Sequence, residues 1–409
     1  MPRSANCCTT AASRSWCYGQ VIAGHQEAIQ PLALEESNLL HARRLARRLG
    51  WWSPVIAAMQ GLKMLYQYQG RQTEWSRLVA ECVSDYCKAE DGPVSGREDG
   101  YTLVMGYRVD LARQLDHDLA RAADLQAKQV DWVRQQAAEA LGLPGDAPLD
   151  AERRNRVRSL GAWLAALGDC LREQGSGDCI ARYLEAIGHC RRIGDTTAEA
   201  ITQLNLGLAY KDIPAIRDLD SAESAYRRSL DLSDPNDALQ HSKCLQAIGM
   251  VYHQRFDAAL ARGEPETVLL DQAQSAETHL LRALALCPVG AIADLGPMHN
   301  ELGNLYHAVG QTERAREHYE QAVQLAERVG DRYSAGKIRF NLAVLYLDSA
   351  EREAALPRRR DLLHRAQAYA QSALRDFGHY QGRAADLEAQ AQQLIDSIAR
   401  SLAEPPQRP

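Results

Sequence analysis

Phenylalanine and long apolar stretches are both scarce in this sequence. Its 409 residues include three phenylalanines but sixteen tyrosines, a balance that suits many amphipathic packing seams better than one deep apolar core. No apolar run approaches the roughly 18–20 residues that a membrane-spanning helix needs. The stretch Met1–Gln26 also lacks the continuous apolar region of a secretory signal. We therefore expect no membrane partner, and we interpret residues 1–29 as a disordered or poorly packed leader.

Motifs that carry catalysis or hold a metal are missing as well. The phosphate-binding pattern GxxxxGK[ST] is absent. The stretch from His299 to Glu301 resembles a fragment of the zinc-protease motif HExxH, but Asn304 stands where that motif needs its second histidine. The ten cysteines include no CxxC pair, and the single pair His241–Cys244 on one helix face is not a metal site. We predict no metal, no cofactor and no reaction, in a reduced, cytoplasmic setting. The alternative is an enzyme whose site is built from residues distant in sequence.

The charge of the chain argues against a nucleic-acid partner. The chain carries a net charge of −6, whereas binding to the phosphate backbone of a nucleic acid needs a dense stripe of basic residues. Local basic runs do occur, and we interpret them as solvated helix faces or loops. These runs are Arg43, Arg44, Arg47 and Arg48; Arg153, Arg154, Arg156 and Arg158; and Arg358, Arg359 and Arg360.

What the sequence does contain is a short pattern that recurs at intervals of about 40 residues. Leu302, Gly303 and Tyr306 define it as a leucine, a small residue and then an aromatic residue three positions later. The pattern returns as Leu167-Gly168-Leu171, Leu206-Gly207-Tyr210, Ile248-Gly249-Tyr252 and Leu342-Ala343-Tyr346. A small–large–small pattern follows as Ala222/Tyr226/Ser229, Ala276/Leu280/Ala283, Ala315/Tyr319/Ala322 and Ala366/Ala370/Ala373. Ahead of these, Ile180/Leu184/Ile187 keeps the spacing without the small residues.

This recurrence predicts helical hairpins that stack on one another. Two helices approach to about 8 Å only when Gly or Ala lies at their crossing, and large side chains three or four residues away fill the space beside it. Such hairpins cannot bury their apolar faces alone, so they pack against copies of themselves. No β-strand alternation is sustained. We predict an all-α fold, a right-handed superhelical solenoid of antiparallel helix pairs, with one leading helix, seven pairs and a closing helix.

The motifs resemble the tetratricopeptide repeat. The spacing near 40 residues and the turns Gly194-Asp195 and Gly330-Asp331 are similar to its long-period subclass. We expect degenerate helical repeats over 30–145, tetratricopeptide-like repeats over 150–380, a capping helix over 381–403 and a disordered tail over 404–409. The resemblance implies a scaffold or adaptor, active in signalling, that binds a protein or peptide in its concave groove.

Polar side chains opposite the packing seam of the first helices would line that groove. Asn is a poor helix former, and its amide can pair with the backbone of an extended peptide. The resemblance implies that Asn304, Asn341 and Lys337 hold such a peptide, while an ordinary solvated helix face is the alternative. The predicted groove residues are Asn205, Lys243, Gln246, Asn300, Asn304, His307, Lys337 and Asn341.

Three tryptophans, Trp51, Trp52 and Trp75, cluster near the amino end. They either pack the first hairpins or form a second docking surface, since large aromatic residues anchor interfaces. The surrounding pattern resembles the repeat arm of bacterial signal-transduction ATPases with numerous domains. That resemblance implies an alternative function, a detached sensor arm that acts on an ATPase or protease partner in trans. It rests on Gly61-Leu62, Tyr66, Gly70-Arg71, Trp75 and Leu78-Val79.

Overall fold

The computed structural model describes residues 30–69, 71–116, 118–145, 147–380 and 384–403. The predicted leader over 1–29 and the predicted tail over 404–409 therefore lie outside the described residues. Within them, regular structure is almost entirely α-helical, and the one β-type pairing is an isolated bridge between Cys87 and Pro93. None of these helices is both long enough and apolar enough to cross a membrane.

The chain divides into two compact units, the first ending at Asp234 and the second beginning at Pro235. This division falls inside the stretch 150–380 that the sequence predicts as one block of repeats. The helices of unit 1 are α2 (Gln30–Leu34), α3 (Glu36–Arg48), α4 (Trp52–Tyr68), α5 (Gln72–Tyr86), α6 (Glu98–Gln114), α7 (Leu119–Leu141), α8 (Ala151–Glu173), α9 (Cys179–Ile193), α10 (Thr196–Asp212) and α11 (Leu219–Leu232), with a short 3₁₀ turn at Pro214–Ile216. Those of unit 2 are α12 (Ala238–Arg262), α13 (Glu266–Leu286), α14 (Ile292–Ala308), α15 (Thr312–Val329), α16 (Arg332–Arg352), α17 (Leu356–Gly378) and α18 (Ala385–Ala403).

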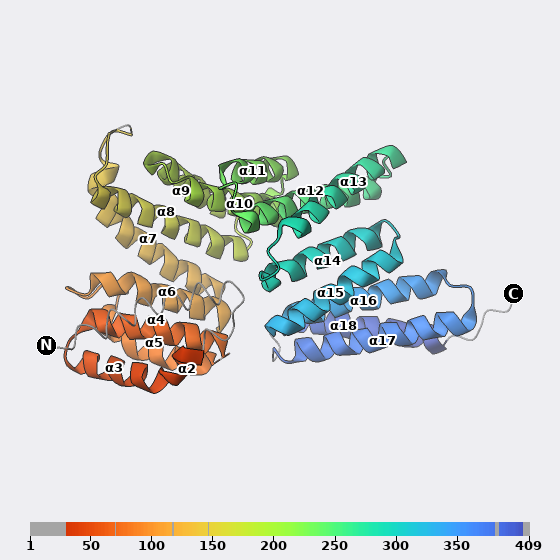
Figure 1. The fold of residues 1–409 in the computed structure, drawn as a ribbon, viewed down its shortest axis with the longest axis horizontal. Helices are drawn as coiled ribbons and strands as arrows, with labels where there is room; N and C mark the ends of the chain where they lie inside the picture. Colours follow the sequence, from red (N-terminus) through yellow and green to blue (C-terminus); the bar gives the residue numbers. More distant parts are fainter. Residues whose placement is uncertain (1–29, 70, 117, 146, 381–383, 404–409) are drawn as a thin grey trace. The chain divides into compact units, whose positions relative to one another are not determined.

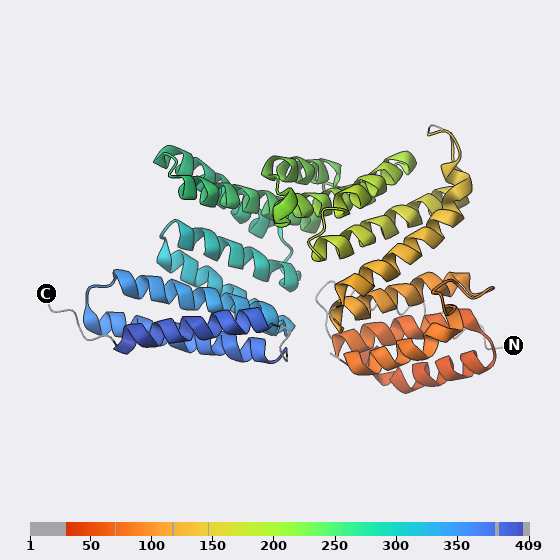
Figure 2. The same cartoon turned by 180° about the vertical axis from the view of Figure 1, so that it is seen from behind.

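Consecutive helices pack as antiparallel hairpins within each unit, as Figure 1 and the reverse view in Figure 2 show. In unit 2 the hairpins are α12/α13, α14/α15 and α16/α17, and α18 packs on α17. In unit 1 the pairs α8/α9 and α10/α11 are formed in the same way, whereas α4 packs more extensively on α3 than on α5, and α7 more extensively on α8 than on α6. The predicted all-α class and its arrangement of paired helices are thus confirmed.

Acidic and glycine residues set many of the helix ends. Asp195 and Asp331 each accept a hydrogen bond from a backbone N–H in the first turn, which satisfies donors that have no partner within the helix. Gly194 and Gly330 end the preceding helices in the left-handed conformation, which costs glycine little. The two predicted Gly-Asp turns therefore stop one helix and start the next.

Close helix crossings are built on a glycine that faces a large side chain. A Cβ placed on Gly303 would lie 2.6 Å from the ring of Tyr319, and one on Gly207 would lie 2.4 Å from the ring of Tyr226. Gly249 meets Leu280 in the same way, at 2.7 Å. Only a residue without a side chain leaves room for these contacts, so the repeated glycine is a packing requirement.

The predicted register of α9 is wrong by one residue. The structure buries Cys179, Tyr183 and Ala186, and the ring of Tyr183 packs on Gly168, whereas Leu184 is 51% exposed. The small–large–small pattern is therefore present in this hairpin too. The run of Ile and Leu in Ile180/Leu184/Ile187 concealed it, because Cys179 acts here as the small residue.

Candidate functional site

Unit 2 places four helices in one row. Helix α12 contacts α14, α14 contacts α16, and α16 contacts α18, while comparable contacts between α13 and α15 or between α15 and α17 are absent from the described residues. We call α12, α14, α16 and α18 the inner row. Because neighbouring hairpins lie closer along this row, the side of unit 2 that it forms is the one expected to be concave.

Three asparagine amides are joined across the inner row. Asn341 on α16 donates from Nδ2 to Oδ1 of Asn300 and to Oδ1 of Asn304, each on α14 and each at 3.2 Å. Asn304 also accepts the hydroxyl of Tyr319 at 2.8 Å, and Tyr319 is 1% exposed. Burial raises the pKa of Tyr319, so this hydroxyl stays a hydrogen-bond donor at any ordinary pH. We call Asn300, Asn304 and Asn341 the amide cluster.

The amide cluster keeps hydrogen-bonding groups to spare. Nδ2 of Asn300 and Oδ1 of Asn341 have no partner among the described residues, although both side chains are half-buried. A side-chain amide offers two donors and two acceptor sites, and the bonds within the cluster use only some of them. One free donor and one free acceptor therefore remain on neighbouring helices.

Charged side chains lie along the same row. Nε2 of His307 is 2.8 Å from Oδ2 of Asp348, which links α14 to α16. Lys243 on α12 forms an ion pair with Asp294 at 3.1 Å. Lys337 is exposed and one helical turn before Asn341, with its ammonium 5.8 Å from the centre of the Tyr333 ring. Lys337 is thus free to meet an anionic group.

Two of the predicted groove residues lie apart from this cluster. Gln246 on α12 is half-buried and makes no hydrogen bond to the amide cluster in the described part of the chain. Asn205 belongs to unit 1, where its Nδ2 donates to Oδ1 of Asp169 at 3.1 Å. The same oxygen accepts the hydroxyl of Tyr183 at 2.7 Å.

The Asn205 contact repeats the geometry of the amide cluster. Asn205 directly precedes Leu206 and donates to Asp169, which follows the glycine of the preceding repeat. Asn341 directly precedes Leu342 and donates to Asn304, which occupies the corresponding position after its glycine. In both places the acceptor also binds the tyrosine that packs on that glycine. Sequence reasoning missed Asp169 and the tyrosine hydroxyls, although their fixed offsets from Gly168 and Gly303 are a signal that could have found them.

The three tryptophans do not form one surface. Trp75 is 1% exposed and packs edge-on against Tyr107 at 5.0 Å between ring centres. Trp52 is half-buried under the guanidinium of Arg97, 3.6 Å from its ring centre. Trp51 alone is more than half exposed, at 55%. Packing accounts for Trp75, and a docking role stays open for Trp51.

Groups suited to metal or nucleophile chemistry do not gather in the described residues. No cluster of three or more His, Cys, Asp or Glu side chains there could hold a metal ion. The cysteines that the structure describes are buried thiols outside any disulfide, and burial raises the pKa of Cys170 and Cys190 to about 11. Such thiols stay protonated at neutral pH and are weak nucleophiles.

Comparisons with known proteins agree with this fold. Residues 294–368, which span the amide cluster, match the tetratricopeptide repeat family. A search of curated proteins gave no match. Among solved structures, the Rap protein complexed with Competence and Sporulation Factor aligns over 97% of this chain and 99% of its own, with a TM-score of 0.50 and 12% identity.

Two further structures align with lower scores. BtubC from P. vanneervenii covers 71% of this chain and 96% of its own, at 17% identity and a TM-score of 0.43. The S. pombe nuclear import adaptor Nro1 covers 73% and 99%, at 13% identity and a TM-score of 0.35. The likeness to ATPase-attached repeat arms stays a hypothesis. Residues 294–368 thus match the tetratricopeptide repeat family, and the chain as a whole has a helical-repeat fold similar to that of the Rap protein.

Proposed function

We propose that this protein is a protein- or peptide-binding scaffold that holds an extended segment of its partner on the inner row of unit 2. The binding residues are Asn300, Asn341 and Lys337, with Asn304 and His307 beside them. No reaction by the chain itself is part of the proposal.

The observation that carries this proposal is the unfilled pair of groups on the amide cluster. Nδ2 of Asn300 can donate to a peptide carbonyl, and Oδ1 of Asn341 can accept from a peptide N–H. Because Oδ1 of Asn300 lies 3.2 Å from Nδ2 of Asn341, the two amides hold each other in place before a ligand arrives. Such preorganisation reduces the entropy that binding must overcome.

Lys337 adds a preference for acidic partners. Its ammonium lies one turn from Asn341 and has no carboxylate partner in the described residues. A peptide held by the amides could therefore place an acidic side chain or a terminal carboxylate against it. The Rap protein, whose fold this chain shares, is seen complexed with Competence and Sporulation Factor, so a chain of this fold can hold a partner.

The test uses peptides selected on the full chain from a displayed library of random sequences. Asn300→Ala combined with Lys337→Ala should weaken the selected peptides by roughly 10- to 1000-fold, because it removes one neutral and one charged hydrogen bond. We avoid Asn304, since its replacement would leave the buried Tyr319 hydroxyl without an acceptor. Affinity is measured by fluorescence anisotropy.

A matched control removes one amide and one cation from α15, a helix of unit 2 that is not part of the inner row. Gln321→Ala combined with Arg328→Ala changes two exposed residues of α15 and should leave affinity unchanged. Equal affinity for the wild type and the Asn300/Lys337 variant, with both folded by circular dichroism, would rule out the inner row as the binding surface.

A further inference from the structure

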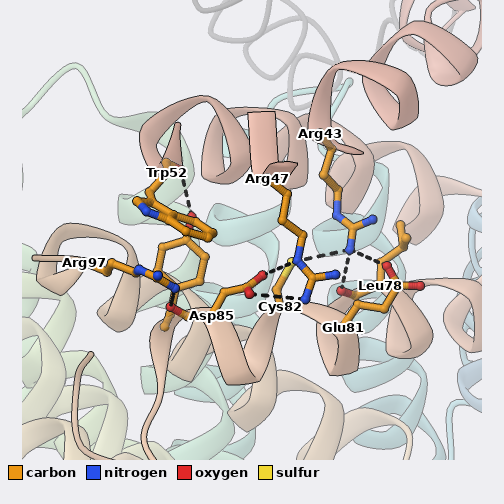
Figure 3. A network of polar contacts seen from close by, with 9 residues as sticks. Arg43, Arg47, Trp52, Leu78, Glu81, Cys82, Asp85 and Arg97 are labelled. Atoms are coloured by element: carbon orange, nitrogen blue, oxygen red, sulfur yellow. Dashed lines mark hydrogen bonds and ion pairs between the residues drawn. The ribbon is translucent and has the colours of Figure 1, made fainter. Parts of the chain in front are cut away.

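Helix α3 lies near the amino-terminal end of unit 1, directly after the short helix α2, and arginines anchor its inner side. Arg43 is 2% exposed and donates to Glu81 at 2.6 Å, while Arg47 forms an ion pair with Asp85 at 2.6 Å. Figure 3 shows both arginines reaching from α3 to α5, with Arg97 and Trp52 beside them. The side of α3 that faces α4 and α5 is thus fixed by packing and ion pairs.

The opposite side of α3 is exposed and carries both basic and apolar side chains. Helical spacing places Arg44 and Arg48 on one flank of this side and Leu45 and Leu49 on the other, with His41 between them. Leu45 is 39% exposed and Leu49 is 51% exposed. His41, Arg44 and Arg48 are exposed as well.

Trp51 is a further exposed apolar residue near the carboxyl end of α3. Gly50 ends α3 in the left-handed conformation, and the N–H of Trp51 then donates to the carbonyl of Ala46 at 2.8 Å. This turn holds Trp51 at the carboxyl end of the helix, where the residue is 55% exposed. Large aromatic side chains of this kind often anchor interfaces.

The charges of this face are not balanced. Neither Arg44 nor Arg48 has a carboxylate partner among the described residues, whereas Arg43 and Arg47 do. An open depression of about 510 Å³ lies beside them. It is lined by His41, Arg43, Arg44, Arg47, Arg48 and Glu81.

From this geometry we propose that the outer face of α3 binds an acidic amphipathic helix of a partner protein. Arg44 and Arg48 are one helical turn apart, and so are Leu45 and Leu49. A partner helix with acidic and apolar residues at the same three- to four-residue spacing would match both flanks at once. The carboxylates would meet Arg44 and Arg48, and the apolar side chains would cover Leu45, Leu49 and Trp51.

Charge complementarity selects this occupant over two others. The leader, residues 1–29, contains one acidic residue, Glu27, and two arginines, Arg3 and Arg14, so it would bring no net negative charge to the arginines. A second copy docking by the same face would place Arg44 and Arg48 against their own equivalents. The exposed leucines and tryptophan favour a protein over nucleic acid, whose charged backbone would leave them uncovered.

The experiment uses a synthetic peptide and the full chain. The probe is a labelled alanine-based peptide of about 18 residues, long enough to form a helix, with glutamates along one stripe and leucines along the next. The reference probe carries lysine in place of each glutamate. We expect the acidic peptide to bind more tightly than the reference, with an affinity that falls as salt rises because the charges are exposed.

Variants of the chain test which residues are used. Arg44→Glu combined with Arg48→Glu should weaken the acidic peptide by about ten-fold or more, since attraction becomes repulsion. Leu49→Gln should weaken it without changing its salt dependence. The matched control, Arg154→Glu with Arg360→Glu, makes the same charge change at two exposed arginines elsewhere and should bind as the wild type does.

Three results would overturn the proposal. One is no binding of the acidic peptide, or no preference for it over the lysine peptide. Another is an equal loss of affinity in the control variant. The third is binding to phosphatidylserine vesicles that the acidic peptide does not displace, which would assign the face to a membrane surface. Each result is read on chains shown to be folded, and none depends on the inner row of unit 2.

Discussion

Replacing Gly303 with alanine tests directly whether the close helix crossings of the repeats require glycine. In the middle of an exposed helix, alanine is more stable than glycine by about 1 kcal/mol. At Gly303 the added Cβ would lie 2.6 Å from two ring carbons of Tyr319 and 3.0 Å from a third. Contacts this short require the ring or the helix to move.

The ring has little freedom to move. Tyr319 is 1% exposed, and its hydroxyl is held at 2.8 Å by Asn304, the residue after Gly303. Overpacking of a tight core costs about 1–3 kcal/mol, and we expect the upper part of that range here. After subtracting the gain in helix propensity, Gly303→Ala should destabilise unit 2 by about 1–2 kcal/mol.

Gly188 provides the control. It lies inside α9 in a helical conformation, and a Cβ built on it meets no atom within 4 Å. Gly188→Ala should therefore stabilise unit 1 by about 1 kcal/mol. The two variants are compared by urea unfolding, and the same change at Gly303 is also made in a Tyr319→Ala background. There the clash is absent, so the alanine should become neutral or stabilising. If Gly303→Ala stabilises the otherwise unchanged chain, the crossing described here is not a close one.

Three further predictions concern buried polar groups. Asp169→Ala should cost about 1–3 kcal/mol of stability in chemical unfolding, because it leaves the buried Tyr183 hydroxyl without its acceptor, whereas Asp169→Asn should cost less. Burial lowers the pKa of His318 to about 4, with His299 and Arg314 adding to the effect, so the unfolded chain binds a proton that the folded chain does not. Stability should fall by on the order of 1–3 kcal/mol as the pH drops from about 6.5 towards 4, and His318→Gln should reduce this loss. The seven described cysteines should react with a thiol reagent only after denaturation, since they are buried; fast reaction in the native state would contradict their placement.

The fold could be predicted because its main constraint is local and repeated. A helix crossing at close range needs a small residue, and the same need at each hairpin leaves the same short pattern in the sequence, as at Gly207 and Gly303. The error in α9 has a local cause too. Several apolar residues in a row allow more than one helical face to look buried, and only the partner helix decides between Tyr183 and Leu184.

The site could be predicted only in part. Helical spacing was enough to place Asn300, Asn304 and Asn341 on the inner row of unit 2. It could not show that these amides bond to one another, because the partners are 37 or 41 residues apart and meet only through the stacking of two hairpins. For the same reason, the link between His307 and Asp348 was not visible in the sequence.

These links change what an asparagine on the inner row can do. Part of each amide joins one repeat to the next, and only the remaining groups are available to a ligand. In unit 1, Asn205 donates to a carboxylate, Asp169, that also binds Tyr183, and the anionic acceptor would repel an acidic peptide. In unit 2 the acceptor is the neutral Asn304, and Lys337 stands one turn from Asn341. We therefore expect the Asn205–Asp169 hydrogen bond in unit 1 to contribute only to stability. The Asn341–Asn304 hydrogen bond in unit 2 should contribute both to stability and to the binding of a partner.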